Sequence, residues 1–365
     1  MINVQFFPSR QIALYMGKTF LLRTLAVLAA LVLVLQTLDL LGESGKILAV
    51  PGNGDAQLWE YVSLRIPQLV ARFLPFAVLL GTLITLVSMN QSSEIISMKA
   101  AGISAHQIIA PLVLASLVVA AFAFVFQERI VTRATARLND WQAVDYGKVP
   151  AGSGTATNVW VREGDDLIYA RSVEGQGNAT RLTGVAIYVR SQGTLESIVT
   201  AASGRPDAGG WRLNDVETFN VERGQTMRAP TMQLGSQIEP ERFTLAAVRG
   251  DEQDFVTLKR LIGELQAGGR NTTSLEAELW HKLSGPLSAI LMPLLAAVAA
   301  FGLARSGQLF VRAVAGMALG FAYFVADNFA LAMGNFGAYP PFLAAWAPFF
   351  LFLLIGETVL LRTEE

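Results

Sequence analysis

Three arginines, Arg129, Arg133 and Arg137, follow a long apolar run at intervals of four residues. On a helix this spacing places the three side chains on one face. A guanidinium group matches the geometry of phosphate and carboxylate groups, so the row predicts an anion site suited to a phosphorylated lipid headgroup. The alternative is a solvated or salt-bridged helix face in which Glu128 and Asp140 are the partners.

Residue groupings for catalysis are missing from the sequence. The chain has no cysteine, which excludes disulfides, thiolate metal sites and cysteine nucleophiles. His106 and His281 are the only histidines and lie far apart in the sequence, so a metal site is not expected. No Gly-x-x-x-x-Gly-Lys-Ser/Thr run is present to hold a nucleotide phosphate. We therefore expect a protein that is not an enzyme, needs no cofactor and does not hydrolyse ATP by itself.

Composition indicates a membrane protein. Hydrophobic residues make up 52% of the chain and charged residues 16%, against about a quarter charged in soluble domains. A hydrocarbon core of about 30 Å needs about 20 helical residues, and several apolar runs meet that length. The net charge of −1 gives no indication of a nucleic-acid partner.

Six apolar segments predict six membrane-spanning helices, at about 20–41, 61–89, 108–126, 279–303, 311–333 and 342–361. The first segment is too long for a cleavable signal, and we expect a retained anchor. A Gly-rich loop is expected at 42–55 and a tight turn at 304–309.

The region between the third and fourth spans has a different character. Five short segments are β-branched or alternate in polarity and are separated by glycine-containing turn signals: 158–162, 166–172, 184–190, 197–201 and 211–221. This predicts an antiparallel sandwich or open barrel. An amphipathic helix at 255–266 would return the chain to the membrane. The predicted organisation is therefore spans one to three in 1–137, a β domain in 138–260, and spans four to six in 261–365.

A short polar and apolar stretch, residues 91–103, separates the second and third spans and reads as one brief helix. Ser92 or Ser93 can cap its start, and Glu94 suits the positive end of the helix dipole. Gly102 can adopt the left-handed conformation that ends a helix.

The same stretch has a face for docking. Ile95, Met98 and Gly102 share one side at helical spacing, so the helix can lie along a surface. Ser104 and Gln107 predict a capping box at the start of the next helix. A helix held between two spans is suited to receive an outside force, and the alternative is an ordinary interfacial loop helix.

Basic residues predict the orientation. The terminal segments and the loops on their side of the membrane, including the 91–103 helix, hold more basic residues than the short loops on the opposite side. The opposite loops hold Lys46 and Arg65. The first group comprises Arg10, Lys18, Arg23, Lys99, Arg305, Arg312 and Arg362. We therefore expect both termini and the short helix in the cytoplasm, and the β domain outside.

This layout, with the motif Ser93-Glu94-x-x-x-Met98-x-Ala100-x-Gly102-x-Ser104 after span two, resembles the LptF/LptG permease family over essentially the whole chain. The resemblance implies a six-helix α-helical membrane protein with a jellyroll-like periplasmic domain between helices 3 and 4. It implies a permease subunit that pairs with an LptF-like paralogue and a dimer of LptB-like ATPases. The complex would extract lipopolysaccharide from the inner membrane and pass it to LptC/LptA-like periplasmic components.

The resemblance also implies roles for individual residues. The 91–103 helix would be the coupling helix in a groove of the ATPase, with coupling residues Ser93, Glu94, Met98, Lys99 and Gly102. The lipid phosphates would be bound by Lys46, Arg129, Arg133 and Arg137. The first span departs from the family pattern because it ends with Asp39 and Glu43. The Leu-Asp-Leu-Leu end of that span and the start of the second favour the G branch of the family.

Two other function classes remain open at this point. An ATPase-driven, force-transmitting protein of the LolC/MacB type would carry its external domain after the first of four spans. An ion-coupled secondary transporter would need ionisable residues deep in its spans. Asp327 is the best candidate for such a residue.

Overall fold

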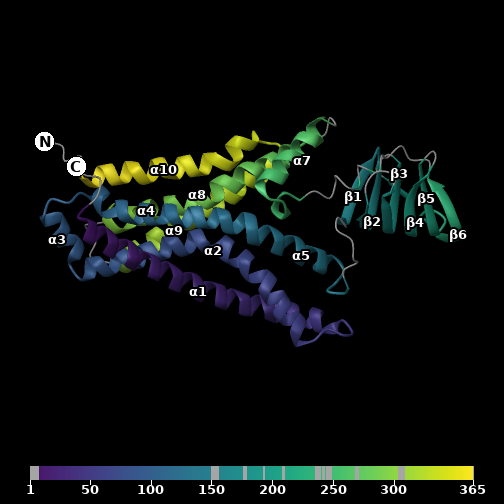
Figure 1. Ribbon diagram of the computed structural model, residues 1–365. Coiled ribbons are helices and arrows are strands. Elements are labelled where there is room, and N and C mark those ends of the chain that lie inside the picture. The colour runs from purple at the N-terminus through teal and green to yellow at the C-terminus, as the bar shows by residue number, and fades with distance from the viewer. Residues whose placement is uncertain are drawn as a thin grey trace. The chain divides into compact units, whose positions relative to one another are not determined.

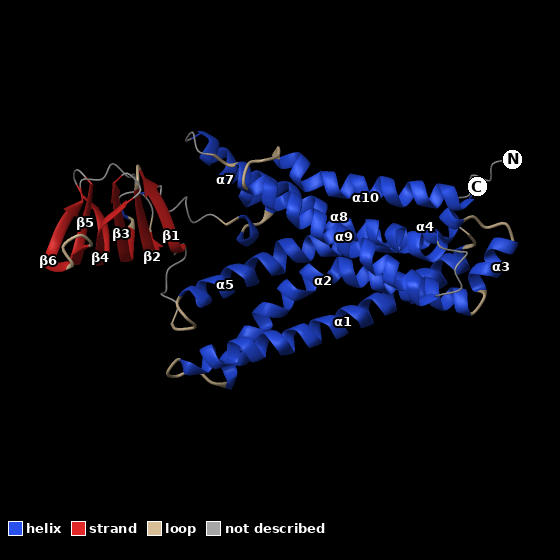
Figure 2. Ribbon diagram, turned by 180° about the vertical axis from the view of Figure 1, so that it is seen from behind, coloured by secondary structure: helices blue, strands red, loops and turns tan. Residues whose placement is uncertain are grey.

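The structure is a computed structural model, and it describes residues 8–148, 156–175, 179–191, 194–207, 210–234, 240, 243, 249–267, 271–302 and 309–364. The chain folds as two compact units. The helical unit comprises residues 1–45, 54–135 and 250–365, and the β unit comprises 46–53 and 136–249. Figure 2 distinguishes the helices of the first unit from the strands of the second.

Long helices lie side by side in the helical unit (Figure 1). The described helices that contribute to it are α1 (Arg10–Ala49), α2 (Asp55–Gln91), α3 (Glu94–Ala100), α4 (Ala105–Phe126), α7 (Phe255–Ala267), α8 (Thr273–Gly302), α9 (Leu309–Asn335) and α10 (Pro341–Glu364). Within the described ranges, 6 helical segments are long and apolar enough to cross a membrane, in agreement with the six segments predicted. The short helix α3 lies at the same end as the start of α1 and the end of α10.

The first helix is longer than the sequence suggested. A Gly-rich loop was expected from residue 42, but α1 continues through Gly42 and Gly45 to Ala49, so that prediction was wrong. Each glycine costs a helix about 1 kcal/mol. Burial of Ile47, whose side chain has 0% exposure, offsets that cost. Residues 304–308 of the turn expected at 304–309, with Arg305, lie outside the described residues, and Leu309 is the first residue of α9.

The second helix crosses the first at very short range. Gly81 of α2 lies against Thr24 of α1, and a Cβ atom added at Gly81 would come 2.8 Å from the Thr24 Cα. Only glycine fits this crossing, as in membrane helix pairs whose small residues let backbones approach. Pro67 and Pro75 both lie inside α2, which continues past them.

The third long helix changes its winding where it leaves the apolar run. A π-helix at Gln127–Val131 connects α4 to α5 (Thr132–Ala143). Single π-turns inside α-helices occur frequently at functional sites. This one contains Glu128 and Arg129, two of the residues that the sequence singled out.

The β unit contains one antiparallel sheet in which each strand pairs with the next along the chain. Its described strands are β1 (Ala156–Glu163), β2 (Asp166–Glu174), β3 (Arg181–Ser191), β4 (Thr194–Asp207), β5 (Gly210–Asn220) and β6 (Gln225–Leu234). The five predicted segments coincide with β1 to β5. The sixth strand was missed because most of its side chains are exposed, which leaves no apolar alternation to recognise.

One face of the sheet carries an apolar core. Val159, Ala170, Ile187 and Leu213 are among its buried residues, and Trp211 packs edge-on against Phe243 with ring centroids 5.0 Å apart. Phe243 follows the last strand, so the chain after β6 helps to cover this face.

The amphipathic helix predicted at 255–266 is present as α7, and Asp254 caps its start. The Asp254 carboxylate accepts hydrogen bonds from the backbone N–H groups of Val256 and Thr257, at 3.1 and 3.0 Å, and from the Thr257 hydroxyl at 2.7 Å. The Thr257 hydroxyl is the largest of the influences that hold the Asp254 pKa below its ordinary value.

We predict that Asp254→Ala lowers the stability of α7 by about 1 kcal/mol, because three donors lose their acceptor. The stabilisation by Asp254 is complete above the ordinary pKa of 3.8 and is lost as the pH falls through the lowered pKa of the folded state. Hydrogen exchange of the α7 amides measures both effects, with Asp254→Ser as the control that retains a cap. Unchanged α7 exchange in Asp254→Ala would contradict the prediction.

Candidate functional site

The short helix α3 is anchored in the main core of the helical unit. Ile95 and Met98 are 5% and 9% exposed and belong to the same apolar cluster as Met16 and Phe20 of α1. The cluster also contains residues from the end of α2 and the start of α4. Helix α3 contacts α2 and α4 and shares this cluster with α1, so the packed core connects a displacement of α3 to all three long helices.

The ends of α3 follow the predicted signals only in part. Ser93 is the N-cap residue, but its φ of 61° is left-handed and its side chain makes no capping bond, so the predicted serine cap was wrong. The Ser92 hydroxyl instead donates to the Glu94 carboxylate at 2.7 Å, and the Tyr15 hydroxyl lies 3.5 Å from the same oxygen. Glu94 is thereby tied to α1.

The C-terminal end of α3 agrees with the sequence. Gly102 has a φ of 84°, the left-handed conformation that was predicted. Ser104 and Gln107 form the predicted capping box at the start of α4: the Gln107 N–H donates to the Ser104 hydroxyl at 3.2 Å, and the Ser104 N–H donates to the Gln107 side chain at 3.1 Å.

The five residues expected to contact an ATPase do not all lie on the same side. Ser93, Lys99 and Gly102 are exposed and Glu94 is half-buried, whereas Met98 faces the protein's own core. Sequence reasoning missed Ile96, which is 60% exposed on α3. The sequence could have indicated Ile96, because it is a large apolar residue that lies off the face formed by Ile95, Met98 and Gly102. A large exposed apolar side chain near Lys99 suits contact with a partner.

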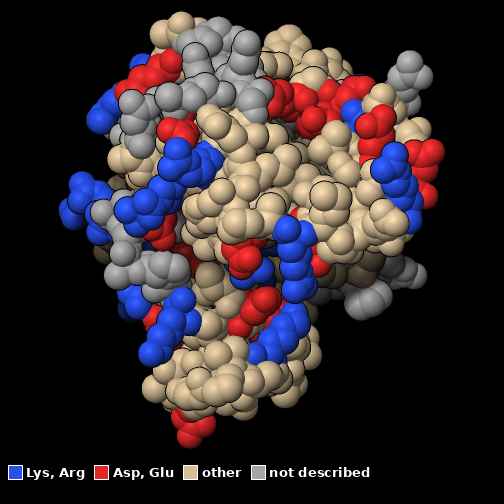
Figure 3. Space-filling view, turned by 90° about the vertical axis from the view of Figure 1, so that its right-hand side faces the viewer, with Lys and Arg blue, Asp and Glu red and all other residues tan. Residues whose placement is uncertain are grey.

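The arginine row lies on the outside of the π-helix and α5. Arg129, Arg133 and Arg137 are all exposed, and Lys46 is exposed in the last turn of α1. Lys46 and Arg137 belong to the β unit, whereas Arg129 and Arg133 belong to the helical unit. Among the described residues, the face seen in Figure 3 carries both basic and acidic side chains around uncharged areas.

A buried ion pair joins the π-helix to α8. The Lys282 ammonium lies 3.5 Å from a Glu128 carboxylate oxygen, and the two side chains are 6% and 13% exposed. The other Glu128 oxygen accepts the backbone N–H of Phe255, the first residue of α7. Glu128 is therefore engaged with α8 and with the start of α7.

Two further charged residues of α8 are also engaged. His281 lies 3.0 Å from the Asp327 carboxylate of α9. Glu278 lies one helical turn before Lys282 on α8 and is close enough to it for electrostatic attraction. Asp327, the residue considered for ion coupling, is thus one half of an interhelical pair.

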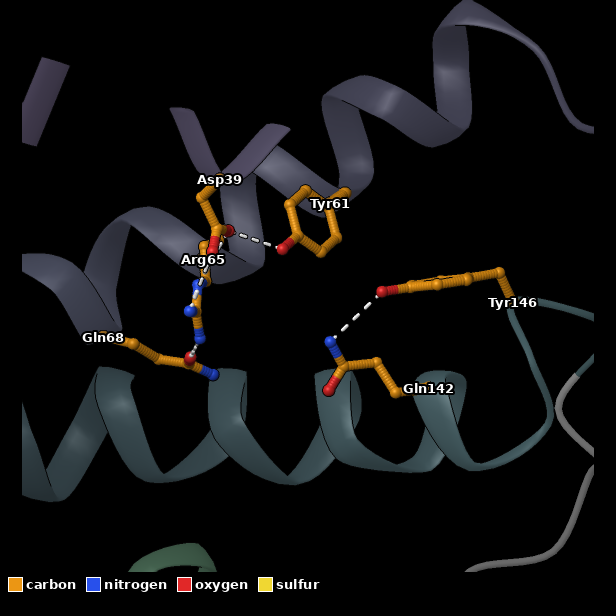
Figure 4. A network of polar contacts seen from close by, with 6 residues as sticks. All are labelled: Asp39, Tyr61, Arg65, Gln68, Gln142 and Tyr146. Atoms are coloured by element: carbon orange, nitrogen blue, oxygen red, sulfur yellow. Dashed lines mark hydrogen bonds and ion pairs between the residues drawn. The ribbon is translucent and has the colours of Figure 1, made fainter. Parts of the chain in front are cut away.

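A third cluster joins α1 to α2 (Figure 4). Arg65 donates two hydrogen bonds to the Asp39 carboxylate, at 2.9 and 3.0 Å, and a third to Gln68 at 2.7 Å. The buried Tyr61 hydroxyl donates to the same carboxylate at 2.5 Å. Bidentate arginine–carboxylate pairs of this kind are among the stronger side-chain interactions.

Within the described residues, no group of three histidine, cysteine, aspartate or glutamate side chains is arranged to hold a metal ion. The charged groups of the helical unit instead form pairs between helices. This arrangement can hold helices together and transmit displacement.

We predict that Glu128→Ala lowers the melting temperature, because it removes the ion-pair partner of the buried Lys282 ammonium and leaves only the Glu278 carboxylate to attract it, at a cost of about 3 kcal/mol. The double substitution Glu128→Gln with Lys282→Met removes both charges and keeps an acceptor for Phe255, so it should recover more than half of the loss. Thermal unfolding of the purified protein measures this. A double variant as unstable as Glu128→Ala would show that the ion pair is not the cause.

The sequence matches the family described as lipopolysaccharide export system permease LptF/LptG over residues 14–362. It is 26% identical over 361 residues to the lipopolysaccharide export system permease protein LptG of Escherichia coli K12. The alignment covers 95% of this chain and 97% of that protein. It is 24% identical over 361 residues to the LptG protein of Haemophilus influenzae, with coverage of 96% and 98%. With its six long apolar helices, this multi-pass membrane protein belongs to the LptF/LptG family of lipopolysaccharide export permeases.

Proposed function

We propose that this chain is the LptG-type permease subunit of an ABC exporter that extracts lipopolysaccharide from the inner membrane. The observation that carries the proposal is α3: its inner side is fixed in the core by Ile95 and Met98, and its outer side presents Ile96 and Lys99. The family match over nearly the whole chain and the LptG names of its relatives support the assignment.

The energy would come from a partner chain. The family is that of a permease subunit, and a dimer of LptB-like ATPases would bind and hydrolyse the ATP, so the permease itself needs no cofactor. Closure of the ATPases would push the outer side of α3. Because Met16, Phe20 and Met98 pack in one cluster, the push would reach α1 directly. An LptF-like permease would supply the second half of the membrane cavity.

The lipid would leave on the side opposite α3. In this proposal both termini and α3 are cytoplasmic, and the β unit is periplasmic. The exposed row Arg129, Arg133 and Arg137 would bind the lipid phosphates, and Lys46 is a further basic residue proposed for the same role. The sheet would form one wall of a jellyroll-like domain whose apolar face accepts acyl chains and passes them to LptC/LptA-like components.

The two alternatives explain less. A protein of the LolC/MacB type would insert its external domain after the first of four spans, whereas here the β unit follows the third of 6 candidate spans. An ion-coupled transporter would use Asp327 as its ionisable group, but Asp327 is paired with His281 at 3.0 Å. Transport that continues without any ATPase and stops in Asp327→Asn would favour the ion-coupled mechanism.

We predict that Glu94→Arg uncouples ATP hydrolysis from transport. The substitution reverses a charge at the start of α3 and removes the acceptor of Ser92 and Tyr15, while the buried anchors Ile95 and Met98 stay in place. An arginine near a helix N-terminus costs only about 0.5 kcal/mol, so the fold should persist.

The measurement is lipopolysaccharide release per ATP hydrolysed by the reconstituted complex. Release should fall by about tenfold, equivalent to about 1.4 kcal/mol of coupling. Glu264→Arg, at an exposed position on α7, is the matched control for charge reversal. Release in Glu94→Arg equal to that of the unmodified complex would contradict the role of Glu94.

A further inference from the structure

The first helix is peripheral, and much of its apolar surface is not covered by the chain itself. Leu22, Leu33, Leu38 and Leu41 are each more than half exposed. In the most apolar stretch of α1, 17% of the residues are buried, against 50% in α2. The contacts between α1 and α2 therefore decide how independently α1 can move.

At one level of the pair, the contact is the Asp39 cluster. Arg65 and Tyr61 of α2 together direct three hydrogen bonds at the carboxylate of Asp39 on α1 (Figure 4). The Arg65 and Asp39 side chains are 29% and 23% exposed, and Tyr61 is 1% exposed. The cluster is largely withdrawn from solvent, which strengthens charge-assisted bonds.

At the opposite level, α1 is bonded to the backbone and side chains of α2. Arg23 donates to the Ile84 carbonyl at 3.0 Å and to the Ser88 hydroxyl at 2.9 Å. Nearby, Thr24 lies against Gly81, where α2 has no side chain. A carbonyl oxygen has two lone pairs, so the Ile84 carbonyl can accept from Arg23 in addition to its own intrahelical N–H.

Between the two levels, an apolar seam connects the helices. Leu28, Val32 and Leu35 of α1 belong to one cluster with Leu69, Val70 and Phe73 of α2. The α1 residues recur at helical spacing and form one stripe, which packs into a cluster that also contains Val119 and Ala123 of α4.

The fastened region spans both prolines of α2. Arg65 lies before Pro67, and Gly81 and Ile84 lie after Pro75. Proline removes a helix hydrogen bond and introduces a site of bending. A second helix fixed on both sides of such sites restrains the bend.

We propose that α1 acts as a splint for α2: the two helices are fastened on both sides of Pro67 and Pro75 and move as one rigid pair during transport. Asp39 is the positioning residue at one end of the pair. The proposal rests on the proposed export function, because the movement in question is the one that takes place during export. It adds that any sideways opening beside α1 displaces α2 with it and does not peel α1 away.

Cross-linking tests the proposal in the reconstituted complex. Leu35→Cys and Val70→Cys put one thiol on each helix, beside the same apolar cluster, and the native chain contributes no cysteine of its own. The fraction of disulfide formed on oxidation is measured on a non-reducing gel, and release is compared at full cross-linking. Oxidation should leave more than half of the ATP-dependent lipopolysaccharide release of the reduced sample. Loss of release on oxidation, with recovery on reduction, would overturn the rigid pair. If the unmodified complex also releases no lipopolysaccharide, the absence of release from the reduced double-cysteine sample counts against the export function and not against the rigid pair.

A distance measurement covers the case in which the cysteine pair itself impairs the protein. Spin labels at Leu41 and Ile84, which are 71% and 45% exposed, report the separation of distant points on α1 and α2. The separation should change by no more than about 2 Å between the nucleotide-free and vanadate-trapped complexes, the scale of a small helix shift. A larger change would overturn the proposal whether or not transport is measured.

Asp39→Asn tests the role of the cluster. It removes the negative charge that holds Arg65 while keeping the size of the side chain, so the spin-label distribution should broaden. Asp55→Asn, at the exposed start of α2, removes a carboxylate outside the cluster and should leave the distribution unchanged. Equal spin-label distance distributions in Asp39→Asn and the unmodified protein would contradict the positioning role of Asp39.

Discussion

The high cost of a charge in an apolar interior governs the helical unit. The eighth helix carries Glu278, His281 and Lys282 into a packed environment, and such groups are tolerated only with partners. Lys282 meets Glu128 on the π-helix, and His281 meets Asp327 on α9. Because the partners come from different helices, satisfying the charges of α8 also sets which helices it contacts. Glu128 adds the start of α7 to the same assembly through the Phe255 N–H.

Helix α3 shows how a short element can transmit force through this assembly. Its two sides differ: Ile95 and Met98 are embedded in the core, while Ile96 and Lys99 remain outside. A close-packed interior does not absorb displacement by local compression. A force on the outer side is therefore passed to the helices that share the core cluster, including α1 through Met16 and Phe20.

The Asp39 cluster gives the acidic residue near the end of the first span a structural role. An acidic residue near the end of the first span does not attract a phosphate, but here it neutralises Arg65 and ties α1 to α2. Arg65 is thereby used for helix pairing. The three arginines that follow α4, Arg129, Arg133 and Arg137, are exposed.

The sequence alone determined what depends on local composition. Long apolar runs identified the 6 candidate spans, and Gly102 with Ser104 and Gln107 marked the end of α3 and the start of α4. Polar–apolar alternation identified five strands. Tertiary structure decided which charges pair, because Glu128 and Lys282 meet only through packing of segments far apart in the chain. It also extended α1 through its glycines, turned Met98 inward and added β6, where contacts with distant residues outweighed weak local preferences.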